Sequence, residues 1–146
     1  MVDVRELYQE MILDHQKNPR HHYALANPSS QANGFNRLCG DRLTVYLQIE
    51  HDRVVDISFV GCGCAISQAS ASLMTEVLHG NSVATAQQIF KDFHAMLTQN
   101  DAQIIEGKLS VLAGVRLFPA RVKCATLAWH TMIAALKNES ATVVTE

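Results

Sequence analysis

Residues 43–66 read LTVYLQIEHDRVVDISFVGCGCAI, and the rest of the chain can be placed around them. Apolar and polar residues alternate over 43–49, and an apolar-rich run follows over 54–60, on either side of the polar turn His51-Asp52-Arg53. This pattern predicts two strands joined as an antiparallel hairpin. A glycine-flanked pair of cysteines, Cys62 and Cys64, then ends the second strand, and helical spacing begins at Ile66.

Helical spacing of apolar residues recurs on both sides of the hairpin. A first helix is predicted over residues 4–17, with Asp3 and Glu6 as its capping box and Asn18-Pro19 as its stop. Residues 21–38 are rich in Asn, Ser, Ala and Gly and predict a loop. Further segments are expected as follows: a helix from Ile66 to His79-Gly80, one with Ser82 as its N-terminal cap, a short apolar stretch at 109–112, a last helix from near Cys124, and a frayed polar tail over 138–146.

A hairpin followed by a run of helices predicts an α+β fold, with a small antiparallel β-sheet and helices packed on one of its faces. A chain of 146 residues is the size of one domain, so we expect a single domain over 1–146. The loop GCGCAI lacks both the dinucleotide pattern G-x-G-x-x-G and the phosphate-loop pattern G-x-x-x-x-G-K-S/T. The motifs therefore disfavour a nucleotide site of either kind.

The charge balance argues against two classes of binding partner. Twelve Lys and Arg against fourteen Asp and Glu leave a formal net charge of −2, so the composition gives no basic footprint for nucleic acid or a membrane surface. The chain has no signal-peptide core and no apolar run near the ~20 residues of a membrane span, so we expect it in the cytoplasm. In that reducing compartment four cysteines are expected as metal ligands or reactive thiols rather than disulfides.

Three of the four cysteines lie where loops meet predicted elements. Cys39 and Asp41 lead into the first hairpin strand at positions i and i+2, so an extended backbone points both side chains the same way. Cys64 lies at the mouth of a predicted helix, where unpaired N–H groups favour a thiolate. Cys124 is expected at another helix start, beside Lys123. Three thiolates and one carboxylate would offer zinc four ligands of types that it accepts.

Other roles for these residue types are also open. Free cysteine is among the most buried residue types, so each thiol could be a small core residue, although the glycines around Cys39, Cys62 and Cys64 argue against this. The histidines are expected on the surface or partly buried rather than as ligands, and His15 is expected to be structural. Three serines of the second helix are expected to allow close packing: Ser67, Ser70 and Ser72.

Several motifs follow one another from the first predicted helix to the last: LYQEMILDH at 7–15, KNPR at 17–20, CGD at 39–41, GCAISQASASLMTE at 63–76 and RVKCATLAW at 121–129. In this order and spacing the chain resembles the SufU branch of the NifU/IscU-type iron–sulfur cluster assembly proteins. The stretch GVRLFP at 114–119 is a further point of resemblance, because an extra segment before the last cysteine distinguishes SufU-like from IscU-like chains.

The resemblance implies an α+β domain that holds a zinc ion and receives persulfide sulfur from a SufS-like, pyridoxal-phosphate-dependent cysteine desulfurase. The implied metal ligands are Cys39, Asp41, Cys64 and Cys124. In that family Cys39 would leave the zinc shell when the desulfurase docks and would act as the catalytic sulfur acceptor. Arg121, just before the last cysteine, would contact the partner.

Cys62 departs from the SufU pattern, which usually has another residue between the two glycines. The IscU branch has its middle cysteine at this place, so the chain carries the middle cysteines of both branches. We assign Cys64 as the ligand because its context, Gly-Cys-Ala-Ile-Ser, is SufU-like, whereas Cys62 is an additional thiol that could replace it, relay sulfur or bind a cluster. Lys123 stands where the IscU branch has a histidine, which favours the SufU-like ligand set.

Three functions are consistent with these residues. The first is a zinc-dependent sulfur acceptor that works with a desulfurase in iron–sulfur cluster assembly. The second is a scaffold that assembles a [2Fe–2S] or [4Fe–4S] cluster on Cys39, Cys64 and Cys124 and passes it to apo-proteins. The third is a structural zinc domain used for protein binding.

Overall fold

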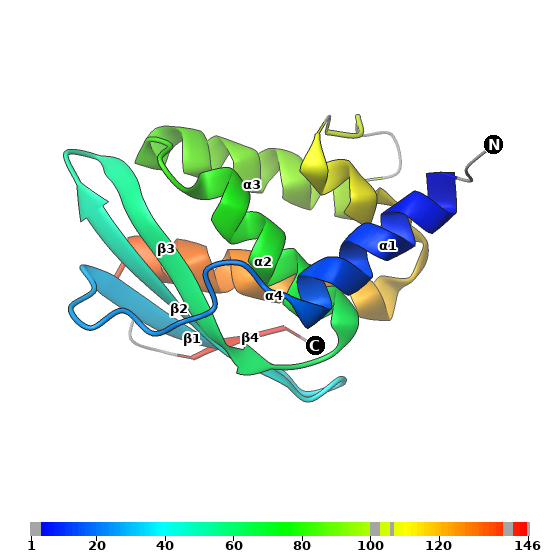
Figure 1. The fold of residues 1–146 in the computed structure, drawn as a ribbon, viewed down its shortest axis with the longest axis horizontal. Coiled ribbons are helices and arrows are strands. Elements are labelled where there is room, and N and C mark those ends of the chain that lie inside the picture. The colour runs from blue at the N-terminus through cyan, green and yellow to red at the C-terminus, as the bar shows by residue number, and fades with distance from the viewer. Residues whose placement is uncertain (1–3, 100–102, 106, 139–141, 146) are drawn as a thin grey trace.

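The computed structural model describes residues 4–99, 103–105, 107–138 and 142–145, with side chains from residue 9 onward. It contains one sheet, of strand order β3-β2-β1-β4, with the helices on one of its faces (Figure 1). This arrangement confirms the predicted α+β class. Within the described ranges, no helix combines the length and apolar character that crossing a bilayer requires.

The predicted hairpin forms the centre and one edge of the sheet. Strands β2 (Asp41–Glu50) and β3 (Arg53–Cys62) pair antiparallel. The two residues between them, His51 and Asp52, have φ of 52° and 60°. Positive φ at both positions is typical of a type I′ turn, whose twist matches that of the flanking strands. Apolar side chains on one face of the hairpin are buried in the core, among them Leu43, Val45, Leu47, Val54, Ile57 and Phe59.

Strand β1 (Ser30–Asn36) lies inside the segment predicted as a loop, so that prediction is wrong for these residues. The strand pairs antiparallel with β2 along its whole length. Its sequence, SQANGFN, is poor in strand-forming residues because helix α4 (Pro119–Leu136) packs closely against it. A Cβ at Gly34 would overlap Oγ1 of Thr131 and lie 3.1 Å from Cδ1 of Leu127. Glycine is therefore required here by close approach rather than by a turn.

The end of the chain also differs from the prediction, which placed a frayed tail over 138–146. Strand β4 (Val143–Val144) pairs parallel with β1, opposite Gly34 and Phe35. The backbone N–H of Thr145 donates to the carbonyl of Phe35 at 3.0 Å. These bonds satisfy backbone groups that β1 would otherwise present at an open sheet edge.

Four helices and a 3₁₀ segment complete the fold: α1 (Val4–Lys17), α2 (Ala65–Leu78), α3 (Val83–Thr98), η1 (Lys108–Leu117) and α4. The predicted cap of α3 is confirmed, because Ser82 accepts a hydrogen bond from the N–H of Thr85 at 3.0 Å. The predicted cap Asp3 lies outside the described residues. Helix α4 begins at Pro119 rather than near Cys124, because proline lacks only an N–H that a first helical turn does not use.

The centre of the core lies where α2, α3 and α4 meet. The rings of Trp129 and Phe93 stack with centroids 4.5 Å apart. The indole N–H of Trp129 donates to Oγ of Ser70 at 3.1 Å, and that hydroxyl donates to the carbonyl of Ala125 at 2.5 Å. Ser70 therefore allows close packing, as predicted, and also satisfies the buried indole.

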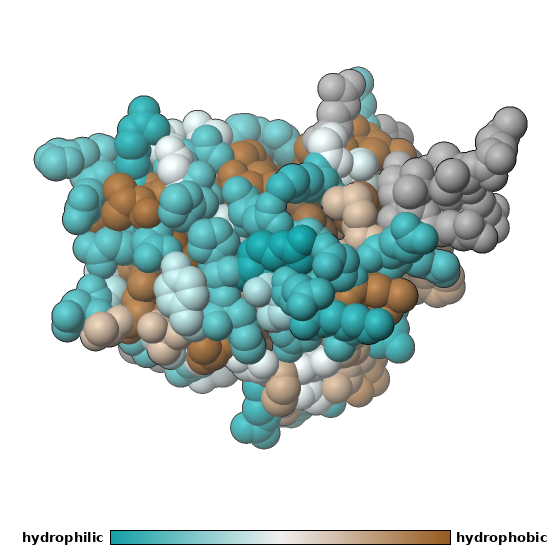
Figure 2. All heavy atoms as spheres, in the orientation of Figure 1, coloured by the Kyte–Doolittle hydropathy of each residue, from teal (hydrophilic) through white to brown (hydrophobic). Residues whose placement is uncertain are grey.

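On the outside, hydrophilic residues cover most of the face in Figure 2, and hydrophobic residues form small separate patches.

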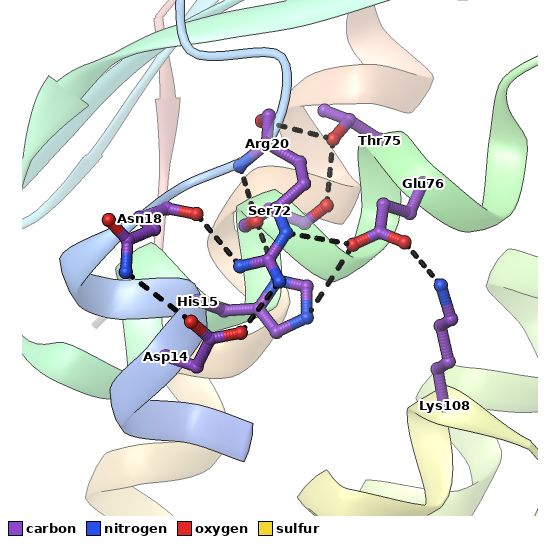
Figure 3. Close-up of polar contacts among 8 residues, drawn as sticks. All are labelled: Asp14, His15, Asn18, Arg20, Ser72, Thr75, Glu76 and Lys108. Atoms are coloured by element: carbon purple, nitrogen blue, oxygen red, sulfur yellow. Dashed lines mark hydrogen bonds and ion pairs between the residues drawn. The ribbon is translucent and has the colours of Figure 1, made fainter. Parts of the chain in front are cut away.

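A polar cluster fastens the end of α1 to α2 and η1 (Figure 3). Nδ1 of the buried His15 lies 2.7 Å from Oγ of Ser72, which also accepts from the N–H of Arg20 at 2.8 Å. Glu76 pairs with Nε of Arg20 at 3.3 Å and with Lys108. Burial, together with the charge of Arg20, lowers the pKa of His15, so its ring is held neutral. The structural role expected for His15 is therefore confirmed.

The close approach of β1 and α4 predicts the effect of one methyl group. We expect Gly34→Ala to lower the free energy of unfolding by about 1–3 kcal/mol, because the new Cβ must displace Thr131 in a packed interface. Urea denaturation followed by circular dichroism measures this. The control is Gly114→Ala, since a Cβ there meets nothing within 4 Å. Equal midpoints for the two variants would contradict the packing account.

Candidate metal and sulfur site

The site is organised around the buried carboxylate of Asp41. Asp41 is the first residue of β2 and pairs with Asn36, the last residue of β1, across the turn that carries Cys39. Its side chain is fully buried. Oδ1 accepts the backbone N–H of Cys64 at 2.8 Å, and Oδ2 lies 3.4 Å from the amide nitrogen of Asn36. These contacts hold the carboxylate in one orientation.

Gly63 makes room for this carboxylate at the start of α2. A Cβ on Gly63 would lie 2.5 Å from Oδ1 of Asp41, so only glycine allows this approach. The next residue, Cys64, is the N-cap of α2, and its side chain makes no capping hydrogen bond. The thiol of Cys64 is thus at the positive end of a helix, as the sequence predicted. Its backbone, in turn, is bound to Asp41.

Cys124 brings helix α4 into the site. Its side chain is fully buried, and its Sγ lies 3.0 Å from Sγ of Cys39 and 3.4 Å from Nδ2 of Asn36. The sulfurs of Cys39 and Cys124 and a carboxylate oxygen of Asp41 all lie within 4.8 Å of one another. Two segments distant in sequence, the turn from Cys39 to Asp41 and helix α4, therefore converge on one group of metal-ligand atoms.

Three of the four predicted metal ligands meet in this group, and the fourth lies beside it. Among the described residues, the thiol of Cys64 is not one of the mutually close ligand atoms. It is near enough to interact electrostatically with Cys124 and Arg121. Cys62 is different, because it is exposed at the end of β3, opposite Arg42 of β2. The geometry thus separates the two neighbouring cysteines.

The donor atoms suit a divalent cation. Burial raises the pKa of the Cys124 thiol well above its usual range, and its contacts with Cys39 and Asp41 act in the same direction. A buried thiol of this kind loses its proton at neutral pH only when a positive charge close by stabilises the thiolate. Thiolates and a carboxylate are ligands that zinc accepts. The residues present therefore fit a zinc ion.

Cys124 gains no charge stabilisation from a helix end, which corrects one expectation from the sequence. Because α4 begins at Pro119, Cys124 lies in its second turn. Lys123 also points elsewhere: it lines a separate hollow with His130 and Thr145. The cation that does reach the site is Arg121, whose guanidinium lies 3.7 Å from Sγ of Cys39. Its proximity to Cys124, Cys64 and Cys39 raises the pKa of Arg121.

Asn36 is the residue of the site that sequence reasoning missed. It is fully buried, and its amide contacts both Asp41 and Cys124. Its carbonyl oxygen accepts the N–H of Leu38 at 3.1 Å, which shapes the turn before Cys39. No local sequence signal marks it, because the residues that β1 buries, at positions 32, 34 and 36, are alanine, glycine and asparagine rather than an alternating apolar set.

The comparisons with known proteins agree with this fold. The family model described as NifU-like N terminal domain matches residues 7–141, and the chain belongs to that family. It is 42% identical over 128 residues to the zinc-dependent sulfurtransferase SufU of Bacillus subtilis, with 86% of each chain covered. It is 38% identical over 140 residues to the iron–sulfur cluster assembly scaffold protein IscU of Streptococcus pyogenes, covering 94% of this chain and 87% of the relative.

A solved structure is similar over nearly the whole fold. It is the putative iron–sulfur cluster assembly scaffold protein for the SUF system from Fervidobacterium islandicum AW-1. The TM-score is 0.83 at 33% sequence identity, and the match covers 92% of this chain and 99% of that one. The α+β architecture is therefore common to both proteins.

The fit between Gly63 and Asp41 predicts how the site responds to a methyl group. Gly63→Ala is expected to weaken Co²⁺ or Zn²⁺ binding about 10–100-fold, the usual effect of disturbing the groups that orient a ligand. Competitive titration with a chromophoric chelator measures the affinity. Gly114→Ala is the matched control, because it adds the same methyl group in open space. Unchanged affinity in Gly63→Ala would rule out Asp41 as a positioned ligand.

Proposed function

We propose that this chain, acting as a single domain in the cytoplasm, is a zinc-dependent sulfur acceptor in iron–sulfur cluster assembly. The observation that carries the proposal is the contrast within one group of ligand atoms: Cys124 is fully buried, whereas Cys39 is half-buried and faces Arg121. One thiol is thus suited to hold a metal and the other to react. Family membership and the similarity to the zinc-dependent sulfurtransferase of Bacillus subtilis support the same function.

The proposed zinc ligands are Cys39, Asp41, Cys64 and Cys124. Three of them supply the mutually close ligand atoms, and Cys64 lies at the rim of the same group. When bound, zinc would keep these thiols deprotonated at neutral pH. Asn36 would orient the ligand atoms of Asp41 and Cys124, because its side-chain amide contacts both residues.

The proposed sulfur donor is the persulfide of a pyridoxal-phosphate-dependent cysteine desulfurase of the SufS type. The thiolate of Cys39 attacks the outer sulfur of that persulfide. A new S–S bond forms on Cys39, the S–S bond of the donor breaks, and the electron pair leaves with the donor's cysteine thiolate. No net oxidation occurs, and the terminal sulfur then passes to an apo-protein or a carrier. Arg121 stabilises the anionic sulfur, since its guanidinium already contacts Cys39.

The surroundings of Cys39 suit a protein partner. Leu38, next to it, is 63% exposed, and Leu117 and Phe118, just before α4, are 75% and 61% exposed. The carbonyl of Phe118 accepts the N–H of Arg121, which brings this second pair close to the reactive thiol. Exposed apolar side chains around a polar reactive centre are typical of a protein-binding surface. Arg121 is accordingly proposed as a partner contact.

A cluster scaffold is the second candidate, favoured by the relatives named as scaffolds and by the three thiols near one another. It would use Cys39, Cys64 and Cys124 as cluster ligands, with Cys62 available as a further one. Iron and sulfide would then give a visible charge-transfer spectrum after anaerobic reconstitution, and the cluster would transfer intact to an apo-protein. Stimulation of a desulfurase without iron would favour the sulfur acceptor instead.

Zinc content tests the ligand set. The purified protein is expected to hold about one zinc per chain, and Cys124→Ala and Cys64→Ala are expected to lose most of it, because each removes one of four ligands. Cys62→Ala is the matched control and is expected to keep its zinc, since Cys62 is exposed and outside the ligand group. Full zinc in both ligand variants, or loss of zinc only in Cys62→Ala, would overturn the assignment.

Sulfur transfer tests the role of Cys39. Incubated with a SufS-type desulfurase and cysteine, the wild-type protein should become persulfidated at Cys39, and Cys39→Ser should abolish this. Cys62→Ser should leave it intact. Mass spectrometry of the intact protein detects the added 32 Da of one sulfur atom. If Cys39→Ser still stimulates the desulfurase as wild type does, the chain is a structural zinc domain and the proposal fails.

A further inference from the structure

A basic hollow lies on a different face of α4 from the face that carries Cys124 into the metal-ligand group. It is an open cavity of about 510 Å³ between the end of α3, η1, the first turns of α4 and the strand β4. Four of its lining side chains are basic: His94, Arg116, Lys123 and His130. Among the described residues that line it, none is acidic. Arg116 and Lys123 thus place two positive charges in one concave region of a chain whose net charge is −2.

The spacing of these residues explains the concentration. Lys123 and His130 are seven residues apart on α4, close to two helical turns, and therefore share one face. Lys137, seven residues further, lines an adjoining hollow that also includes His130 and Thr145. Cys124 points to another face, because consecutive helical residues are about 100° apart. The basic hollow is consequently separate from the group around Cys39.

The two permanent cations of this hollow have no carboxylate partner in the described part of the chain. Arg116 and Lys123 are both half-buried, and neither forms an ion pair there. By contrast, Arg20 and Lys108 are paired with acids. Partly desolvated, unpaired cations are unfavourable. An anion bound between them would offset that cost with charge-assisted hydrogen bonds.

The remaining lining residues indicate what accompanies the anionic group. The hydroxyls of Thr98, Thr126 and Thr145 donate to the carbonyls of His94, Val122 and Lys123, so their oxygens are left to accept hydrogen bonds. The His94 and His130 rings meet edge to face with centroids 5.3 Å apart, beside the apolar Leu97 and Val122. Acceptors next to a ring-lined apolar wall suit a ligand with hydroxyl or amino donors and a flat organic portion.

We propose that this hollow binds a small phosphate-bearing organic molecule of the nucleoside monophosphate type. Arg116 and Lys123 would hold the phosphate, and the rings of His94 and His130 would pack against the organic portion. The volume exceeds what phosphate alone requires and falls in the range of small-molecule sites. The site relies on side chains, which is consistent with the absence of a glycine-rich phosphate loop in the sequence.

Isothermal titration calorimetry of the full-length, zinc-loaded protein tests the proposal with AMP, adenosine and inorganic phosphate. AMP should bind saturably, with adenosine and phosphate each at least tenfold weaker. The double variant Arg116→Gln/Lys123→Gln should lose at least tenfold in AMP affinity and keep its sulfur acceptance. Lys91→Gln, an exposed cation of α3 outside the hollow, is the control and should bind AMP as wild type does.

A measurement on the wild-type protein guards against misfolding of the variant. The ring resonances of His94 and His130 in NMR spectra should shift on addition of AMP, while those of His51, in the hairpin turn, should not. No saturable AMP binding, AMP binding unchanged in the double variant, or adenosine or phosphate binding as tightly as AMP would overturn the proposal. Zinc content and persulfidation of Cys39 are measured separately, so failure here leaves the sulfur-acceptor function standing.

Discussion

The rest of the site depends on the contacts that the buried carboxylate of Asp41 makes with its two hydrogen-bond donors. A carboxylate with no exposed surface is strongly unfavourable unless donors surround it, and here the donors are the N–H of Cys64 and the amide of Asn36. They belong to the start of α2 and the end of β1, while Asp41 begins β2. Satisfying one anion therefore sets how three elements meet, and Gly63 is the position that allows them to meet closely.

The fourth element, α4, reaches the same place through packing rather than charge. Its approach to β1 depends on Gly34, and its depth in the core is set by Trp129, which stacks on Phe93 and binds Ser70. Cys124 is carried into the site by this helix and arrives fully buried, whereas Cys39 stays half-buried on a turn. The division that we propose, between a thiol that holds the metal and a thiol that reacts, thus follows from the element that each cysteine occupies.

The sequence predicted the parts of the fold that follow from strong local patterns. The hairpin, α1, α2 and the cap of α3 have clear periodicity or cap chemistry, and the ligand residues are flanked by glycines or lie in family motifs. Strand β1 was missed because its side chains are chosen for close contact with α4 and for contact with Asp41, neither of which is local information. Asn36 was missed with it. The start of α4 was misplaced because Pro119 breaks a helix interior but suits a first turn.

We propose that a carboxylate and three thiolates, rather than four thiolates, hold zinc in this protein. X-ray absorption at the zinc K-edge of the zinc-loaded protein tests this most directly, because sulfur and oxygen ligands differ in distance by about 0.3 Å. Three sulfur ligands at roughly 2.3 Å and one oxygen ligand at roughly 2.0 Å are expected. A shell of four sulfurs would mean that Cys62 takes the place of Asp41, and it would rule out Asp41 as a zinc ligand.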